Sequence, residues 1–375
     1  MKGLFLVFHG LSAHSGITKK IQAQCQALSR CGVPTQLCYL EVTPQGSRRR
    51  RVDDHMMTDF GGGLRGRLMH RIDFSSVASY VRTHGINLVY VRYDHNPTPC
   101  MIHLLRELKQ SGVRIALEIP TYPYDHEARG QSFSIRLKLF IDRCLRRWLM
   151  PYVDRIVTFS DDEEIFGRPT IRISNGVDFA QIPLAVRSEK QAADFVLLGV
   201  ANIHLWHGFD RVIAGLAAYY RTPQSRCVRF VLVGDGDCEL IASLREQIRT
   251  NGLNDYVELT GPLSGAALDK VFERCDLAVG SLARHRSGID KIRTLKNREY
   301  AARGVPFIYS ESDADFDTQP YVMKIAADDT PLDIEAVMRF GRGMTLQPAA
   351  IRATVEGRLS WERQMEDVIT QMKTI

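Results

Sequence analysis

The sequence lacks any apolar stretch that approaches the roughly 20 residues needed to span a bilayer. Its eight cysteines form no Cys-x-x-Cys pair, and no group of histidines completes a zinc-binding pattern. Most of the cysteines lie in apolar stretches, which indicates a reducing compartment. The apolar run at 4–8 is shorter than the core of a signal peptide and is expected to be a buried strand.

The composition is that of a globular protein. Hydrophobic residues make up 45% and charged residues 25% of the 375, which excludes disordered, collagen-like and disulfide-stapled chains. The length fits two domains of ordinary size. Residues 1–190 hold 27 Lys and Arg against 18 Asp and Glu, whereas the remainder holds 22 against 25. This imbalance predicts that the first domain faces an anionic surface or substrate, with solubility alone as the alternative.

Short apolar runs alternate with longer amphipathic stretches along the whole chain, which predicts parallel sheets covered by helices. Residues 43–75 read as irregular and polar, and 179–191 read as a linker after which the alternation restarts. The expected fold is α/β, with two doubly wound, Rossmann-like domains and a cleft between them. Ligands of such sheets bind at the carboxyl ends of the strands. The expected strands of both halves are 4–8, 35–42, 88–93, 114–119, 155–159, 195–200, 228–233, 257–259, 277–279 and 306–309.

Two phosphate-binding fingerprints, Gly-x-Gly-x-x-Gly and Gly-Lys-Ser/Thr, are absent from the first strand–helix loop at 9–16. Gly16 closes this loop, where small residues and a helix N-terminus suit an anion, although a plain tight turn explains it equally well. Gly234 lies in a Val-Gly-Asp-Gly turn at a second strand end, again with a simple turn as the alternative.

Cationic residues are concentrated at 284–298, between a strand end and a helix. A diphosphate binds at such a place, and Glu299 in the following helix is an acceptor for two ribose hydroxyls. A solvated charged face is the alternative. The cations are Arg284, Arg286, Lys291, Arg293, Lys296, Arg298 and, when protonated, His285.

The order of five motifs resembles GT-B glycosyltransferases, close to glycosyltransferase family 4 and its bacterial polysaccharide-biosynthesis relatives. The block 295–308 is similar to the family's Glu-Ala-x-Ala-x-Gly-x-Pro-Val-Ile motif, and 173–178 contains its Asn-Gly-Val-Asp. The other three motifs are at 231–236, 259–279 and 359–362. The resemblance implies domains at 1–178 and 179–347, with the closing segment 348–375 crossing back to the first.

The resemblance also implies roles for single residues in the second domain. Glu299 falls on the glutamate that binds the donor ribose, and Gly261 lies beside the base. Three family positions differ, because Lys291 replaces the first motif glutamate and a neutral side chain stands at both diphosphate-gripping positions. We expect another cation to supply the missing charge, or His207 alone to serve. The two replaced gripping positions are Asn202 and His207, and the candidate cations are Lys296, Arg286 and Arg293.

The segment 118–127 follows a strand of the first domain and is expected to face the cleft. Carboxylates bind hydroxyls and aromatic rings stack on sugars, so the segment supplies candidates for catalysis and acceptor binding; packing of the tyrosines is the alternative. His95 is a further candidate. The catalytic candidates are Glu118, Asp125 and His126, and the acceptor-binding candidates are Tyr122 and Tyr124.

The stretch 135–150 mixes arginine and lysine with large apolar residues, which suits contact with anionic lipid headgroups or, equally, packing on the sheet with a solvated basic face. No metal-binding Asp pair or nucleic-acid module is recognised, so we expect no metal, no cofactor and no nucleic acid. The expected location is the cytoplasm, including the inner face of the plasma membrane.

These features predict an enzyme that transfers a sugar from a nucleotide sugar, UDP first by family frequency, to a glycan or lipid-diphosphate-linked acceptor. The resemblance implies retention of configuration. Two other hypotheses stay open. One is a UDP-sugar epimerase of the same architecture, and the other is a degenerate, non-catalytic glycosyltransferase that acts as a scaffold at the membrane.

Overall fold

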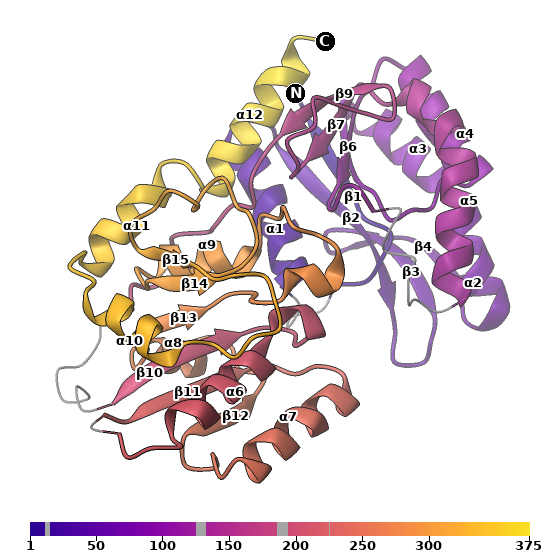
Figure 1. Cartoon of the computed structure of the whole chain (residues 1–375). Coiled ribbons are helices and arrows are strands. Elements are labelled where there is room, and N and C mark those ends of the chain that lie inside the picture. The colour runs from indigo at the N-terminus through magenta and orange to yellow at the C-terminus, as the bar shows by residue number, and fades with distance from the viewer. Residues whose placement is uncertain (12–15, 125–132, 186–193, 225) are drawn as a thin grey trace. The chain divides into compact units, whose positions relative to one another are not determined.

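The computed structural model describes residues 1–11, 16–124, 133–185, 194–224 and 226–375. The chain divides into unit 1, Met1–Gly176 with Trp361–Ile375, and unit 2, Val177–Ser360. Each unit is a sheet with helices on both faces (Figure 1). Unit 1 runs from indigo to magenta and also includes the yellow C-terminal helix, whereas unit 2 runs from magenta through orange to yellow. The predicted α/β class with two Rossmann-like sheets is confirmed.

A nine-stranded sheet, in the order β4-β3-β2-β1-β5-β6-β7-β9-β8, forms the centre of unit 1 in the described residues. The run from β2 to β9 is parallel, whereas β3, β4 and β8 are antiparallel to their neighbours. The strands are β1 Gly3–Leu6, β2 Thr35–Val42, β3 Arg48–Val52, β4 His55–Gly61, β5 Leu88–Arg92, β6 Arg114–Ile119, β7 Arg155–Thr158, β8 Glu164–Ile165 and β9 Arg168–Arg172.

Alternate residues of these strands enter two separate hydrophobic layers, because successive side chains point to opposite faces of a sheet. Leu4 and Leu6 pack with α3, α4 and α5, whereas Phe5 and Val7 pack with α1 and α12. The helices of unit 1 are α1 Gly16–Arg30, α2 Gly63–Ile72, α3 Ser75–Thr83, α4 Pro99–Gln110, α5 Phe133–Leu149 and α12 Trp361–Lys373.

The segment 43–75 is not irregular, as the sequence suggested, but forms β3, β4 and α2. The arginines of β3 are spread along a narrow antiparallel ribbon instead of a solvated loop. Arg50 is buried between the rings of Phe60 and Phe74, 5.0 and 4.8 Å from their centroids, while Arg49 pairs with Asp59 at 2.8 Å. Cation–π and ion-pair contacts thus replace the apolar alternation on which strand prediction depends.

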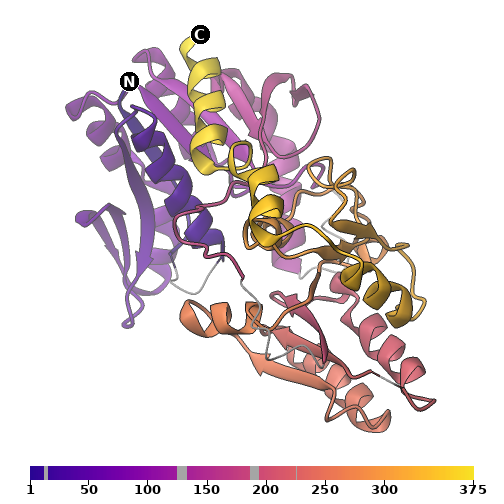
Figure 2. The ribbon, with the colours of Figure 1, turned by 90° about the vertical axis from the view of Figure 1, so that its left-hand side faces the viewer.

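The C-terminal helix α12 packs along α1 in unit 1 (Figure 2). Its first residue, Trp361, is 3% exposed and lies against Gly176, where an added Cβ would approach the indole at 2.5 Å. The indole ring therefore leaves no space for any side chain at position 176.

We expect Gly176→Ala to lower the free energy of unfolding by about 1–3 kcal/mol, because the rigid, buried indole cannot yield to an extra methyl group. Urea unfolding measures the change. Gly357→Ala is the matched control, since no atom lies within 4 Å of the Cβ that it adds. Equal effects of the two substitutions would contradict the packing argument.

Unit 2 contains an all-parallel, six-stranded sheet in the order β12-β11-β10-β13-β14-β15 within the described residues. The strands are β10 Phe195–Val200, β11 Val228–Val233, β12 Val257–Gly261, β13 Leu277–Val279, β14 Phe307–Tyr309 and β15 Val322–Lys324. The helices are α6 Phe209–Tyr219, α7 Cys238–Thr250, α8 Ala266–Phe272, α9 Leu295–Ala302, α10 Ile334–Arg342 and α11 Pro348–Glu356.

The closing segment 348–375 consists of two helices that belong to different units. Helix α11 packs on α9 in unit 2, and the chain enters unit 1 only at Trp361. Residues 348–360 therefore lie in unit 2 and not, as the sequence suggested, with the helix that returns to the first domain. Among the described residues, no helix is both long enough and apolar enough to cross a bilayer.

Candidate functional site

A cluster of buried polar groups in unit 2 lies where its strands end. Strands β10 to β14 are parallel, so the loops that follow them gather at one edge of the sheet. Helix α9 begins beside the loop after β13, as shown by the 3.2 Å between the Lys296 ammonium group and the Ser281 hydroxyl.

Lys296 is the cation at the centre of this cluster. Burial of its ammonium group, together with the charge of Arg284, lowers the pKa of Lys296 to about 7, although Glu311 opposes the shift. An anion placed beside Lys296 would raise this pKa again and hold the ammonium group charged. Binding of an anion at this position would therefore be accompanied by proton uptake near neutral pH.

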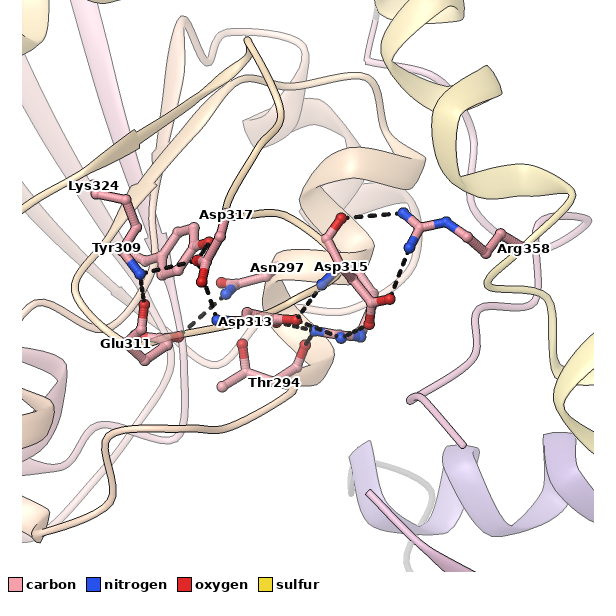
Figure 3. A network of polar contacts seen from close by, with 10 residues as sticks. Thr294, Asn297, Tyr309, Glu311, Asp313, Asp315, Asp317, Lys324 and Arg358 are labelled. Carbon is pink, nitrogen blue, oxygen red and sulfur yellow. Dashed lines mark hydrogen bonds and ion pairs between the residues drawn. The ribbon is translucent and has the colours of Figure 1, made fainter. Parts of the chain in front are cut away.

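Arg284 and Glu311 complete the charged part of the cluster. Arg284 is 6% exposed and Glu311 is 1% exposed. Burial lowers the pKa of Arg284, and burial raises that of Glu311 although Arg284 and Lys296 oppose it. The Asn297 amide donates to Glu311 Oε1 at 3.2 Å, and Lys324 donates to the Glu311 carbonyl (Figure 3).

Several polar atoms of the cluster are buried without a hydrogen-bond partner in the described part of the chain. A buried polar group left unpaired costs about 1–3 kcal/mol, so such atoms gather where a polar ligand or water completes them. Two cations and several unused donors and acceptors suit a ligand with anionic and hydroxyl groups. The atoms are Arg284 Nε, Asn297 Oδ1, Ser310 Oγ and Glu311 Oε2.

Arg298 fixes the segments that carry this cluster. Its guanidinium group is fully buried, donates to the Thr294 carbonyl at 3.1 Å, and forms ion pairs with Asp313 and Asp315. Arg358 reaches the other side of Asp315, with Nη1 2.8 Å from Oδ1 (Figure 3). The start of α9 and the chain from Glu311 onward are thereby held together by one ion-pair network.

The two family diphosphate positions, Asn202 and His207, carry no permanent charge here. His207 is buried, and its Nδ1 accepts a hydrogen bond from the His204 N–H at 2.9 Å. Burial and the charges of Lys296 and Arg284 hold the pKa of His207 well below its usual range, so the ring is neutral at pH 7. Asn202 is exposed. Without a bound anion, His207 therefore adds no positive charge to the site, and its role as the sole source of that charge stays a prediction.

Arg286 is engaged away from the cluster. Its Nη2 lies 2.8 Å from Asp210 and 2.6 Å from Asp329, and these carboxylates raise its pKa. Its charge is balanced by these protein carboxylates, so its role as a diphosphate ligand stays a prediction. Lys291 is exposed and forms a backbone bridge with Ser312. Arg293 is partly buried on the segment before α9.

The predicted glycines and Glu299 lie at different places. Gly234 and Gly261 both line a cavity of about 240 Å³ at the strand ends, and the Gly234 N–H donates to the Gly261 carbonyl at 2.9 Å. Glu299 lies on α9 and accepts from Arg303 Nε at 3.0 Å. Gly16 is the exposed first residue of α1 in unit 1.

Glu118 is a structural residue of unit 1 and not a catalytic group. It is fully buried, accepts hydrogen bonds from Gln24 and the Tyr90 hydroxyl at 2.6 Å each, and pairs with Lys20 and Arg92. Burial raises its pKa, but these partners outweigh burial and lower it. An ionised, enclosed carboxylate whose oxygens are already bonded neither reaches a substrate nor exchanges a proton with one.

Tyr124 also belongs to the core. It is 1% exposed, and its hydroxyl donates to Asp142 at 2.8 Å, so it packs instead of stacking on an acceptor. Tyr122 is partly buried against Phe166, at 5.6 Å between ring centroids. Asp125 and His126 lie outside the described residues.

The fold is shared with solved structures, although no protein-family model matches the sequence and no curated protein is detectably similar to it. Sucrose-phosphate synthase from Thermosynechococcus elongatus is similar over all of this chain and 98% of its own, with a TM-score of 0.67 and 13% identity. HepE from Anabaena, in complex with UDP-glucose, matches over the full length of both chains, with a TM-score of 0.63 and 16% identity. A glycosyltransferase from Rickettsia africae has a TM-score of 0.65 and 11% identity over 100% of this chain and 98% of its own.

The chain has the GT-B fold.

Two members of the polar cluster in this GT-B chain, Arg284 and Glu311, were not among the predicted donor-binding residues. Arg284 was counted in the cationic stretch. The apolar residues Leu282 and Ala283 directly before it were a signal in the sequence that this part of the loop is buried, and the structure buries both. Glu311 had no comparable signal, because its burial depends on its contact with Asn297, 14 positions earlier in the sequence.

Proposed function

We propose that the protein is a glycosyltransferase related to family 4 that transfers a sugar from a nucleotide sugar, with UDP as the nucleotide, to an acceptor hydroxyl. The Lys296–Arg284 cluster at the carboxyl edge of the unit 2 sheet carries this proposal. It provides the buried Arg284, the partly buried Lys296 and unused polar atoms at the edge where ligands of parallel sheets bind. The solved structures of HepE, which share the fold, contain UDP and UDP-glucose.

Sugar transfer leaves a nucleoside diphosphate, so negative charge develops on the leaving oxygen as the glycosidic bond breaks. In the proposed site, Lys296 is held charged by the bound diphosphate and, with Arg284, stabilises that charge in a water-poor environment. The N-terminus of α9 adds its dipole to the same position. We propose a retaining reaction without a metal, in line with the family resemblance.

The proposed acceptor is a glycan or a lipid-diphosphate-linked oligosaccharide of bacterial surface polysaccharide synthesis, such as capsule or lipopolysaccharide. The excess of basic residues in the first half of the chain supports an anionic acceptor bound by unit 1. The activity would then take place in the cytoplasm, at the inner face of the plasma membrane. An acceptor anchored by a lipid requires the enzyme to reach the bilayer surface.

Thermal unfolding in the presence of UDP, GDP, CMP, ADP and dTDP tests the donor site. We expect UDP to raise the melting temperature selectively, because a ligand that binds the folded state stabilises it by mass action. Glu299→Ala is expected to weaken this effect through loss of ribose contacts, whereas Glu335→Ala, an exposed acid on α10, is not.

Absence of stabilisation by every nucleotide at millimolar concentration would overturn the donor-site assignment. Turnover of UDP-sugars distinguishes an enzyme from a scaffold, since a scaffold binds UDP without releasing it from a donor.

A further inference from the structure

Helix α5 of unit 1 exposes a second apolar stripe besides the one that faces the core. Leu139 and Leu149 are buried in the core, as is Asp142. On the opposite side Phe140 is 63% and Trp148 is 57% exposed. The exposed stripe keeps helical spacing, so it forms one continuous face: Leu137, Phe140, Ile141, Cys144 and Trp148.

Helix α2 repeats this feature. Leu64, Leu68 and Ile72 are spaced by four residues and are 82%, 57% and 37% exposed. Figure 1 shows α5 along the outer side of unit 1 with α2 at one of its ends. We call the exposed residues of these two helices the α2–α5 face.

Every exposed charge of the α2–α5 face is positive within the described residues of the two helices. Asp142 is the one acidic residue of α5, and it is buried, while α2 has none. A partner with an apolar interior and a negatively charged surface complements this pattern, as an anionic bilayer does. The exposed basic residues are Arg65, Arg67, Arg71, Arg136, Arg143 and Arg147.

The face continues into a cavity of about 530 Å³ in unit 1. Arg71 of α2, and Leu137 and Ile141 of α5, are shared between the face and the cavity lining. The lining also contains His95, which follows the carboxyl end of β5. The lining further contains Arg50, Asp94 and Lys138, so the cavity offers both apolar and charged groups between the face and the strand ends of unit 1.

We infer that the α2–α5 face docks on a bilayer that contains anionic lipids, and that the adjoining cavity admits the head of a lipid-borne acceptor. The acceptor part rests on the proposed function, whereas the docking part rests on the exposed face alone. Apolar side chains enter the interface between headgroups and acyl chains, and the surrounding arginines bind the lipid phosphates. This assigns to α5 the lipid contact that the sequence left balanced against packing.

Vesicle co-sedimentation tests the docking. We expect at least tenfold stronger binding of the full chain to phosphatidylcholine vesicles containing 30% phosphatidylglycerol than to pure phosphatidylcholine, with a loss in high salt. The variant Leu68→Ser/Phe140→Ser/Trp148→Ser is expected to lose at least tenfold, and so is Arg67→Glu/Arg143→Glu. The double variant Val42→Ser/Ile375→Ser removes exposed apolar side chains elsewhere and should bind as the wild type does.

Three results would overturn the docking. The first is equal binding to the two vesicle types, and the second is no loss in either α2–α5 variant. The third is a wild-type dimer in light scattering that the apolar variant dissociates, since a second copy of the chain would then cover the face. UDP stabilisation of each variant reports on unit 2 independently, so failure of the donor site and failure of the docking are distinguished.

Dodecyl phosphate, below its critical micelle concentration, tests the cavity. It should raise the melting temperature of the wild type, and Ile141→Glu, at the cavity wall, should remove this effect while UDP stabilisation persists. Equal stabilisation of both proteins by dodecyl phosphate would show that the lipid head does not bind there.

Discussion

Lys296→Met is expected to weaken UDP-glucose binding by at least tenfold while leaving the fold intact. A hydrogen bond to a charged group contributes about 1.5–3 kcal/mol, and methionine retains the length and apolar stem of lysine without its charge. Isothermal titration calorimetry measures the dissociation constant. The matched control is Lys270→Met, which removes an exposed lysine of α8 in the same unit.

The pH dependence of binding separates this role from a purely structural one. Free Lys296 has a pKa of about 7, and a bound diphosphate raises it, so binding takes up a proton. Affinity should be strongest below pH 7 and fall by up to about tenfold per pH unit above it, until the pKa of the bound state is reached. UDP-glucose is the suitable ligand, because its diphosphate has no proton that titrates near pH 7. A wild-type affinity that is flat between pH 6.5 and 9 would refute the assignment.

Arg298→Ala is expected to destabilise the protein by about 3–5 kcal/mol. The substitution leaves the carboxylates of Asp313 and Asp315 without their buried partner, and Asp313 is 1% exposed. Urea unfolding measures the loss. The control is Arg249→Ala, whose guanidinium pairs with Glu246 on the surface and is expected to change stability by at most about 1 kcal/mol.

A double variant tests whether the loss arises from the unpaired charge. Arg298→Met/Asp313→Asn removes cation and anion together, so it should be more stable than Arg298→Met alone. If the double variant is no more stable, packing of the guanidinium against Phe316, 5.1 Å from its centroid, is the main contribution.

The fold could be predicted from the sequence where burial is continuous. Runs such as those at 88–91 and 230–233 are apolar because both faces of a parallel sheet are covered, and this pattern identifies them as strands. The hairpin of β3 and β4 could not be predicted in this way. Its arginines are satisfied by aromatic rings and by carboxylates across the ribbon, which no local pattern records.

The candidate site could be predicted in part. Lys296 was named because a cationic stretch precedes a helix, and it does lie in the buried cluster. The role of Glu118 was predicted wrongly, because a position near a strand end does not tell which way the side chain points. It is the penultimate residue of β6, and its side chain points into the layer under α1, where Lys20 and Gln24 meet it. Successive side chains of a strand point to opposite faces, so the direction of this side chain depends on the residue at which the strand ends and its loop begins.

The connection between the two units has a consequence for the ancestry of the chain. Val177 N–H donates to the Leu359 carbonyl at 2.7 Å, so the polypeptide enters and leaves unit 2 at adjacent points. Gly176 and Trp361, which flank these points in unit 1, are themselves in contact. Unit 2 is therefore an insertion into the chain of unit 1, and the two connecting segments lie next to each other. A segment of this kind can be exchanged for another by one recombination event at each side, and the path of the host domain stays unchanged.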